Sequence, residues 1–277
     1  MIFNIVVLIK QVPDTRNVGK DAMKEDGTVN RAALQAIFNP EDLNALEMAL
    51  KLKETIDNAV LTVITMGPVR AAEILREALY RGADKAVLVT DSKFAGADTL
   101  STSYVLALAV KKMGKVDVVL GGRQAIDGDT AQVGPQIAEK LNLPQITYSE
   151  EIVSATHTKI QIKRRLERGI EIVETKYPCL ITVHSSAPPC RFKNAKRVMK
   201  FKKAFAHSEL KKENLNPQLV IEEWGASDLN ADIEKLGLNG SPTKVKKIDN
   251  VVLVQKESKI LSATDENIKQ MMKSINN

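Results

Sequence analysis

The strongest constraint on the fold is an alternation of short, nearly continuous apolar runs with longer helical patterns over the first two-thirds of the chain. Such runs are typical of strands covered on both faces, and the segments between them are long enough for crossover helices. We predict strands at Phe3–Ile9, Val60–Thr65, Lys85–Val89, Val116–Leu120 and Cys179–His184. The sequence therefore predicts an α/β fold, with a mostly parallel, Rossmann-like sheet of the adenine-nucleotide-binding kind and helices on both faces.

Capping residues mark the helices between these strands. Asparagine caps a helix, proline fits its first turn, and glycine favours its end. The predicted helices begin at Asn39-Pro40, after Gly67-Pro68, at Asp98-Thr99 and around Thr130; the second ends at Gly82 and the fourth near Leu141.

The pattern changes after these elements. From Tyr148 to Thr175 apolar and polar residues alternate around Arg168-Gly169, which predicts an antiparallel hairpin. Beyond Ala204 the pattern weakens, with a short helix expected near Ala226–Leu236. We therefore divide the chain into an α/β domain over residues 1–204 and a C-terminal arm over residues 205–277 that packs against another chain. The alternative is a tail without fixed contacts.

Charge and cysteine usage exclude several classes of protein. The net charge is +6, but the basic residues gather in Lys193–Lys203 and near Lys244–Lys247, and only 4% of residues are aromatic. Stacking platforms are therefore scarce, which disfavours nucleic acid and favours a solvated face or an acidic partner protein. No apolar run has the length of a membrane span, so we expect no membrane insertion. Cys179 and Cys190 have neither metal nor disulfide spacing, which fits a cytoplasmic protein.

Four segments fall where an open parallel sheet binds ligands, at the carboxyl ends of its strands. They are "KQVPD", "MGP", "SKFAGADT" and "GGRQAIDGDTAQVGP". In the last, Gly121 and Gly122 allow close approach of the backbone to a ligand, and Gly128 is expected to adopt a positive-φ turn. A helix starting at Asp129-Thr130 would then direct its N–H groups at a phosphate or pyrophosphate.

Side chains of this segment suit the same ligand. Arg123 adds positive charge, and Gln124, Thr130 and Gln132 can hydrogen-bond ribose, ribityl or phosphate oxygens. The spacing is neither the G-x-G-x-x-G fingerprint nor the P-loop. The alternative is a glycine-rich turn that only reverses the chain.

A second loop of small residues, Phe94–Thr99, also leads into a helix. Two such loops at neighbouring strand ends predict a ligand longer than a mononucleotide, with one anchor for each end. Gly96 and Thr99 are the candidate contacts, whereas Asp98 is expected to cap the helix rather than bind the ligand.

No combination of residues indicates catalysis by side chains or a metal site. His157, His184 and His207 lie in unrelated contexts without a nucleophile or metal-ligand spacing. We expect all three to be structural or solvated. Bound-cofactor chemistry is therefore the better expectation.

Several long motifs occur in a characteristic order: "VVLIKQVPDT", "NPEDLNALEMALKLKE", "TMGP", "LREALYRGADKA", "FAGADT" and "GGRQAIDGDTAQVGPQIAEKL". From Met1 to about Lys203 they resemble the small (beta) subunit of electron transfer flavoproteins, with a looser match at "GSPTKV". The resemblance implies an FAD-carrying heterodimer, in which residues 1–204 bind the nucleotide or flavin and residues 205–277 pack on the alpha (large) subunit. It places nucleotide contacts at Leu8, Asn39, Pro40, Glu41, Asp42, Met66, Gly122, Arg123, Gln124, Ala125, Ile126, Asp127, Gly128, Asp129, Thr130, Ala131, Gln132 and Val133.

The motifs look like the bifurcating, NADH-oxidising branch of this family, in which the small subunit holds a second FAD where other members hold AMP. AMP would leave the Phe94–Thr99 loop without a ligand, so we expect FAD, with AMP as the alternative. The implied activity starts with NADH as electron donor. One electron goes to ferredoxin or flavodoxin, and the other goes through the large-subunit FAD to an acyl-CoA, enoyl-CoA or hydroxy-acid dehydrogenase.

Two points leave other interpretations open. In "CRFKNAKRVMK", Ala195 stands where many relatives carry the apolar residue that docks the dehydrogenase. We therefore expect a charge-based contact or a different dehydrogenase, the alternative being a basic helix without a partner. A universal-stress-type ATP-binding module would share the sheet, although the long arm counts against it.

Overall fold

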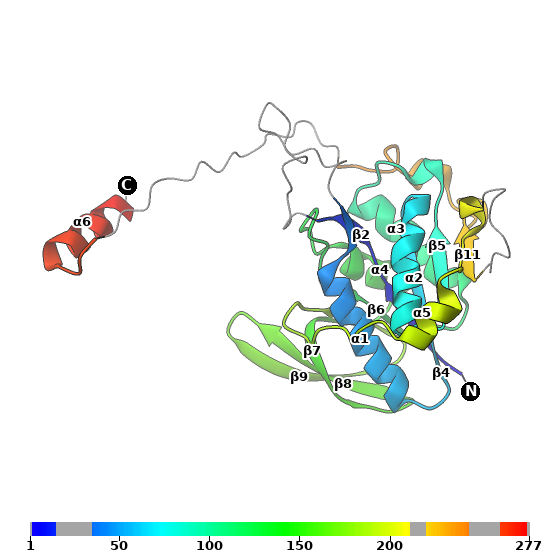
Figure 1. Ribbon diagram of the computed structural model, residues 1–277, viewed down its shortest axis with the longest axis horizontal. Coiled ribbons are helices and arrows are strands. Elements are labelled where there is room, and N and C mark those ends of the chain that lie inside the picture. Colours follow the sequence, from blue (N-terminus) through cyan, green and yellow to red (C-terminus); the bar gives the residue numbers. More distant parts are fainter. Residues whose placement is uncertain (1, 15–34, 211–219, 244–260, 276–277) are drawn as a thin grey trace.

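The apolar runs become neighbouring strands of one sheet in the computed structural model, which describes residues 2–14, 35–210, 220–243 and 261–275 (Figure 1). From edge to edge the strands are β11 (Ile221–Trp224), β5 (Lys85–Val89), β4 (Ala59–Met66), β1 (Phe3–Leu8), β6 (Val118–Gly122), β10 (Cys179–Val183), β7 (Gln145–Ala155), β8 (Lys159–Leu166) and β9 (Gly169–Lys176). The ladders from β11 to β7 are parallel, and those joining β7, β8 and β9 are antiparallel. A separate antiparallel pair is formed by β2 (Gln11–Pro13) and β3 (Ala36–Phe38). The predicted α/β class and the hairpin are confirmed.

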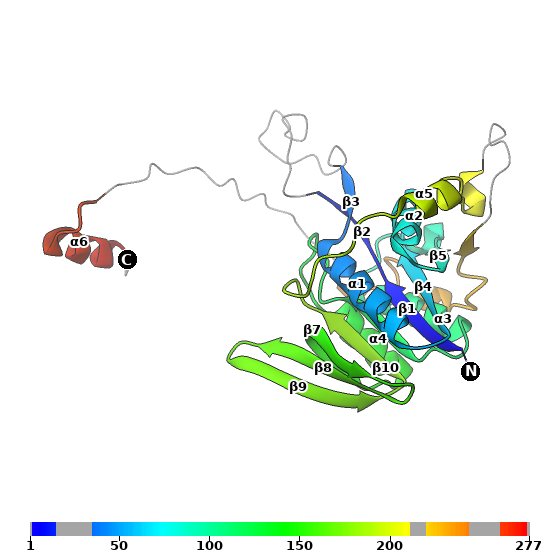
Figure 2. The same cartoon turned by 60° about the horizontal axis from the view of Figure 1, so that its bottom comes forward.

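Helices cover both faces of the sheet (Figures 1 and 2). On one face, α1 (Pro40–Thr55), α2 (Ala72–Arg81) and α5 (Ala195–Phe201) contribute to one apolar core. On the other face, α3 (Thr99–Lys112) and α4 (Val133–Leu141) contribute to a second core, which also contains Trp224 and Leu236 from the chain after β10.

Two predictions from the sequence are wrong, namely the start of one helix and the presence of another. Helix α4 begins at Val133 rather than around Thr130, because Asp129 (φ 50°) and Ala131 (φ 53°) adopt left-handed conformations that interrupt a helix. The helix expected near Ala226–Leu236 is absent from that segment. The segment forms turns and one 3₁₀ turn at Ile233–Lys235 instead.

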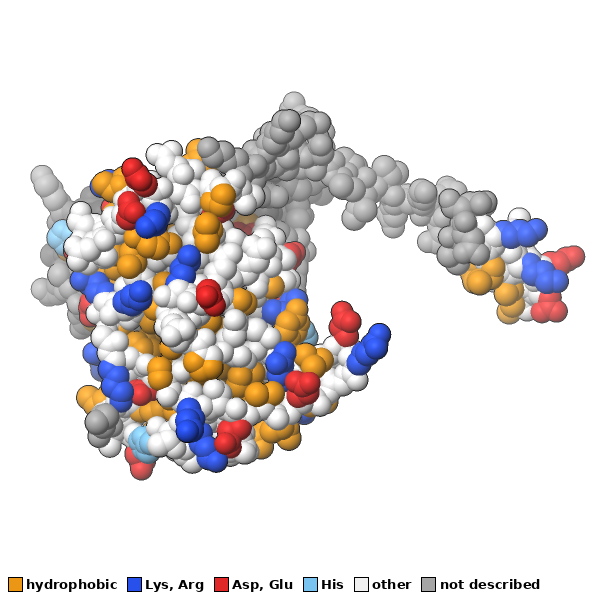
Figure 3. Space-filling view, turned by 180° about the vertical axis from the view of Figure 1, so that it is seen from behind, with side chains coloured by type: hydrophobic (Ala, Val, Ile, Leu, Met, Phe, Trp, Pro, Cys, Tyr) orange, Lys and Arg blue, Asp and Glu red, His pale blue; other side chains and the backbone are white. Residues whose placement is uncertain are grey.

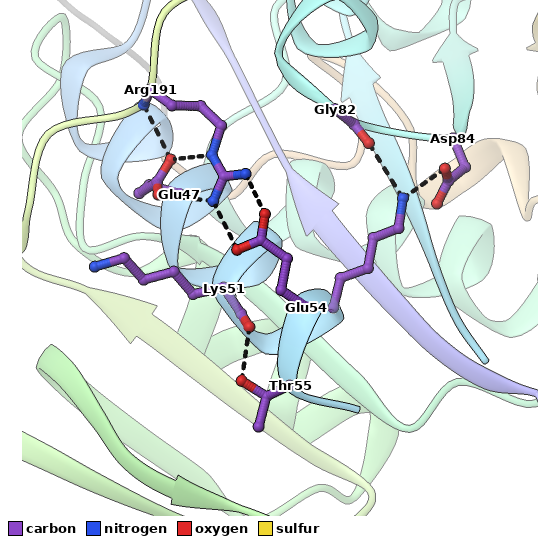
Figure 4. A network of polar contacts seen from close by, with 8 residues as sticks. Glu47, Lys51, Glu54, Thr55, Gly82, Asp84 and Arg191 are labelled. Atoms are coloured by element: carbon purple, nitrogen blue, oxygen red, sulfur yellow. Dashed lines mark hydrogen bonds and ion pairs between the residues drawn. The ribbon is translucent and has the colours of Figure 1, made fainter. Parts of the chain in front are cut away.

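A network of ion pairs ties the segment after β10 to helix α1 (Figure 4). Arg191 donates to the carboxylate of Glu47 through its backbone N–H and Nε, both at 2.9 Å, and its guanidinium also contacts Glu54. Glu47 is nearly buried, and although burial opposes its ionisation, the hydrogen bonds from Arg191 lower its pKa below the usual value. The returning chain is therefore fixed to the helix whose N-terminal end contacts the predicted binding loop after β6.

The basic segment Lys193–Lys203 is only partly free to meet a partner. Lys193 pairs with Glu77 at 3.1 Å, and Arg197 donates to the carbonyl oxygens of Leu79 and Ala83 at the end of α2. Phe192 and Met199 are exposed apolar residues beside these cations. The other basic group, near Lys244–Lys247, lies outside the described residues.

The C-terminal helix α6 (Asp265–Ile275) has apolar and charged side chains on its surface (Figure 3). Ile268, Met271 and Met272 are each exposed to solvent by 44% or more. An amphipathic helix with an uncovered apolar stripe is typical of a segment that packs on another surface. Within the described ranges, no helix is both long and apolar enough to span a bilayer.

Candidate functional site

The chain order of the sheet reverses at β1. The chain passes from β1 to β4 and β5 on one side, and then to β6 and β10 on the other. A crevice beyond the carboxyl ends of the strands is expected at such a switch point. A cavity of about 730 Å³ lies there, lined by residues that follow β1, β4, β5 and β6.

The cavity contains most of the residues predicted from the sequence. Lining it are Leu8, Asp42, Met66, Gly96, Thr99, Gly122, Arg123, Gln124, Ala125, Asp127, Gly128, Asp129, Thr130, Ala131, Gln132 and Val133. Asn39, Pro40, Glu41 and Ile126 do not line it. That any of these residues contacts a ligand remains a prediction.

Two of the residues outside the cavity hold its wall in place from behind. Asn39 donates from its side-chain amide to the carbonyl of Gln124 at 2.9 Å and accepts from the N–H of Ile126 at 3.2 Å. Glu41 accepts from the N–H of Gln124 at 3.0 Å. Asn39 therefore precedes α1 as expected, but its side chain makes no cap and instead shapes the loop after β6.

Asp42 joins the ends of β1 and β6. Its carboxylate oxygens accept from the N–H groups of Lys10 at 2.8 Å and Gly122 at 2.9 Å. Burial raises the pKa of Asp42 to about 7, although these N–H groups and the Lys10 charge act in the opposite direction. The cavity wall therefore contains a carboxyl group whose pKa is raised to about 7.

Arg123 is held by two different groups. Its guanidinium pairs with Glu41 at 3.0 Å and lies 5.6 Å from the ring centroid of Tyr148. Tyr148 itself has a left-handed backbone (φ 59°), a strained conformation for an aromatic residue. The buried Nε of Arg123 has no hydrogen-bond acceptor among the described residues. Arg123 therefore lines the cavity with its guanidinium fixed by Glu41 and with its Nε enclosed by protein atoms.

Sequence reasoning missed Lys10 at the mouth of the cavity. Its ammonium group contacts both carboxylate oxygens of Asp127, at 2.7 and 2.8 Å, and so joins the loops after β1 and β6. The signal was available, because Lys10 begins the "KQVPD" segment directly after the first strand. Lys10 is the second cation, with Arg123, that a bound phosphate could contact.

The loop after Gly128 differs from the expectation. Gly128 has no positive φ, and Asp129 and Ala131 take the left-handed turns instead. The free N–H groups of α4 therefore start at Val133 rather than at Thr130. Gln124 donates to Asp129 at 2.7 Å across this turn, which fixes the loop by side chains rather than by the glycine alone.

The second predicted loop forms the opposite part of the same cavity. Asp98 accepts from the N–H groups of Leu100 at 2.9 Å and Ser101 at 3.0 Å, so it caps α3 as predicted. The hydroxyl of Thr99 donates to Gln132 at 2.8 Å. This bond connects the two predicted loops, and together they enclose one continuous space.

Other candidate chemistry does not converge anywhere in the described part of the chain. The described residues contain no group of three or more His, Cys, Asp or Glu side chains that could hold a metal ion. His157 and His207 are exposed, and His184 hydrogen-bonds Ser186 at 2.7 Å. Burial raises the pKa of the Cys179 thiol to about 12 and that of Cys190 to about 11, which disfavours reactive thiolates.

Known proteins are similar to most of this chain. The electron transfer flavoprotein domain matches residues 26–207. The electron transfer flavoprotein subunit beta of Clostridium acetobutylicum is 48% identical over 88% of this chain and 86% of its own. The caffeyl-CoA reductase-Etf complex subunit CarD of Acetobacterium woodii is 43% identical, covering 87% of this chain and 85% of its own. The acryloyl-CoA reductase electron transfer subunit gamma of Anaerotignum propionicum is also 43% identical, covering 87% and 86%.

Proposed function

This chain belongs to the electron transfer flavoprotein family as a beta (small) subunit, and from that premise we propose that its strand-end cavity binds an FAD that accepts electrons from NADH. When bound, the flavin would supply hydride acceptance and one-electron transfer, dividing electrons between a low-potential ferredoxin or flavodoxin and, through the large-subunit FAD, a dehydrogenase. The observation that carries the proposal is the continuity of the cavity across both loops.

The residues present fit a dinucleotide. Gly122 lets the backbone lie so close to Asp42 that no side chain would fit there. Lys10 after β1 and Arg123 after β6 supply two cationic groups to the cavity wall. The guanidinium group of Arg123 at the cavity wall would attract a phosphate or flavin oxygen. The Phe94–Thr99 loop supplies a second wall with small residues and the Thr99 hydroxyl. AMP would use the first wall and leave the second without a ligand.

The partner proteins follow from the family and from exposed surfaces. We propose a heterodimer with an alpha subunit that covers the end of the C-terminal arm, including the exposed Ile268 and Met272 of α6. Two relatives carry the names of caffeyl-CoA and acryloyl-CoA reductase complexes. An acyl-CoA or enoyl-CoA dehydrogenase is therefore the preferred electron partner, with a hydroxy-acid dehydrogenase as the alternative. All these components act in the cytoplasm under this proposal.

Flavin stoichiometry tests the proposal directly. The small subunit, co-expressed with its alpha subunit and purified, is expected to retain more than one FAD per heterodimer and no AMP. Addition of NADH should bleach the flavin absorbance, and ferredoxin together with the dehydrogenase should restore it. A heterodimer with one FAD and one AMP, unreactive toward NADH, would support the AMP-holding alternative. A colourless homodimer that binds ATP would contradict both.

Arg123→Ala is expected to weaken FAD binding at the small-subunit site by about thirtyfold, the value of a charge-assisted hydrogen bond. The variant removes a charge from the cavity wall and leaves the nearly buried Glu41 unpaired. The FAD released on gel filtration and the rate of flavin reduction by NADH measure the effect. Arg168→Ala, in the exposed tip of the hairpin, is the matched control. Unchanged FAD occupancy in Arg123→Ala would show that Arg123 does not hold the cofactor.

A further inference from the structure

A segment from the C-terminal part of the chain lies against the second loop of the cavity. We call residues 233–243 the strap. The N–H of Leu238 donates to the carbonyl of Ala95 at 3.1 Å, and the N–H of Thr243 donates to the carboxylate of Asp98 at 3.0 Å. The hydroxyl of Ser101 donates to the carbonyl of Lys235 at 2.9 Å. Contacts therefore join the strap to the loop and to the first turn of α3.

Gly237 lets the strap come this close to the loop, and Gly240 allows close backbone contact within the strap itself. Gly237 has a left-handed backbone (φ 53°), and a Cβ there would lie 2.4 Å from the carbonyl oxygen of Lys93 and 2.7 Å from that of Ala95. A Cβ on Gly240 would lie 2.0 Å from the carbonyl carbon of Lys235. Backbone contact of this kind requires glycine, so the strap is shaped to fit the loop rather than merely resting on it.

Ser241 is the central contact. Its side chain is buried, with 2% of the residue exposed. Its hydroxyl accepts from the N–H of Asp98 at 2.8 Å and donates to the carbonyl of Gly237 at 2.6 Å. One hydroxyl thus bridges the loop and the strap at the residue that caps α3. The first-turn N–H groups of α3 and the N–H of Thr243 keep the pKa of Asp98 below its usual value against the effect of burial, so its carboxylate stays ionised at this junction.

The position of this junction decides what it controls. Gly96 and Thr99 lie on either side of Asp98, and both line the cavity. A Cβ on Gly96 would be 3.3 Å from the Cβ of Leu238, so the strap packs directly against the loop at Gly96. The wall formed by residues 121–133 is held by Asn39, Glu41 and Asp42 and meets the second loop at Gln132, which accepts from Thr99.

We propose that Ser241 is a positioning residue that fixes the Phe94–Thr99 loop and thereby makes the cavity select a dinucleotide over a mononucleotide. This inference rests on the proposed function, because it concerns the part of the cavity that FAD would use and AMP would not. Loss of the hydroxyl frees the N–H of Asp98 and loosens the second wall. The first wall keeps its hydrogen bonds to Asn39, Glu41 and Asp42, so affinity for AMP is retained.

Ser241→Ala tests the proposal in the heterodimer that keeps only the large-subunit FAD. Its vacant small-subunit site is titrated separately with FAD and with AMP. We expect FAD to bind about tenfold more weakly than in the wild type, the value of one or two lost hydrogen bonds, with AMP affinity unchanged. Ser149→Ala is the matched control, since Ser149 is buried, its hydroxyl has no hydrogen-bond partner among the described residues, and it does not line the cavity.

A second variant removes another hydrogen bond between the strap and Asp98 and leaves the buried side chain of Ser241 in place. Thr243→Pro deletes the N–H that Asp98 accepts, at an exposed residue. It should lower the FAD-to-AMP affinity ratio in the same direction as Ser241→Ala. Equal losses for both nucleotides, or no change in either variant, would overturn the role of Ser241. A wild-type site that binds AMP and not FAD would instead overturn the proposed function, so the two failures are distinguishable.

Discussion

Gly122→Ala is expected to abolish nucleotide binding at the strand-end cavity and to lower the free energy of unfolding by about 3 kcal/mol, the upper range for overpacking. A Cβ at this position would lie 2.5 Å from Oδ1 of Asp42 and 2.8 Å from the carbonyl carbon of Glu41. Neither neighbour can yield easily, because both belong to the start of α1. Strand β6 and helix α1 would have to separate, which breaks the hydrogen bond between Gly122 and Asp42 and displaces Arg123.

The adjacent glycine supplies the control. Gly121→Ala would place its Cβ no closer than 3.8 Å to Leu8, an ordinary contact, so this variant should unfold with the stability of the wild type. Denaturant unfolding gives the stability difference, and titration with each nucleotide gives the affinity. Wild-type nucleotide affinity in Gly122→Ala would mean that the close approach of β6 to α1 does not shape the site.

Asp42→Asn should change how stability depends on pH. A carboxyl that titrates at 3.8 in the unfolded chain and at about 7 in the folded one favours folding fully below pH 3.8, and this contribution is lost as the pH rises through 7. The lost contribution amounts to about 4 kcal/mol. Asparagine cannot ionise, so the variant lacks this loss. Its stability relative to the wild type should therefore rise as the pH is raised through this window.

Unfolding curves collected from pH 4 to pH 8, in roughly half-unit steps, measure this difference. The hydrogen bonds from Lys10 and Gly122 favour the ionised form of Asp42, and their effect is already part of its pKa of about 7. Asp57→Asn, at an exposed turn after α1, should give a curve parallel to that of the wild type. A constant difference between Asp42→Asn and the wild type across the whole range would contradict the raised pKa.

Sequence alone located the main strands because their apolar runs are continuous and covered by helices on both faces. Lys85–Val89 has the predicted bounds, and Phe3–Leu8 and Cys179–Val183 each end one residue earlier than predicted. The strand Ile221–Trp224 was not predicted, since four residues with two glutamates in the middle show no buried-strand pattern. Its place beside β5 is decided by a pairing across the sheet that local sequence does not encode.

In the candidate site too, features set by local sequence could be predicted and those set by contacts between distant residues could not. Residues directly after strands could be predicted, because parallel topology brings strand ends together. The roles of Asn39 and Glu41 could not, since both depend on contacts with a loop more than eighty positions away, at 2.9 and 3.0 Å. The left-handed turns at Asp129 and Ala131 were missed because a glycine nearby, Gly128, is the residue that ordinarily takes such a conformation. The strap was missed because its contacts with Asp98 join distant parts of the chain.

Strand β11 also determines when the sheet can be finished during synthesis. It pairs with β5, which belongs to the first third of the chain, yet it is made only after β10 has been completed. In a nascent chain, β5 is therefore an exposed edge strand with unpaired N–H and C=O groups. Strands of other chains can pair with such an edge and aggregate. Strand β11, which covers the edge of β5, carries the acidic pair Glu222-Glu223. Because this short strand is synthesised late, the time before β11 pairs with β5 is when the new subunit is most prone to aggregate.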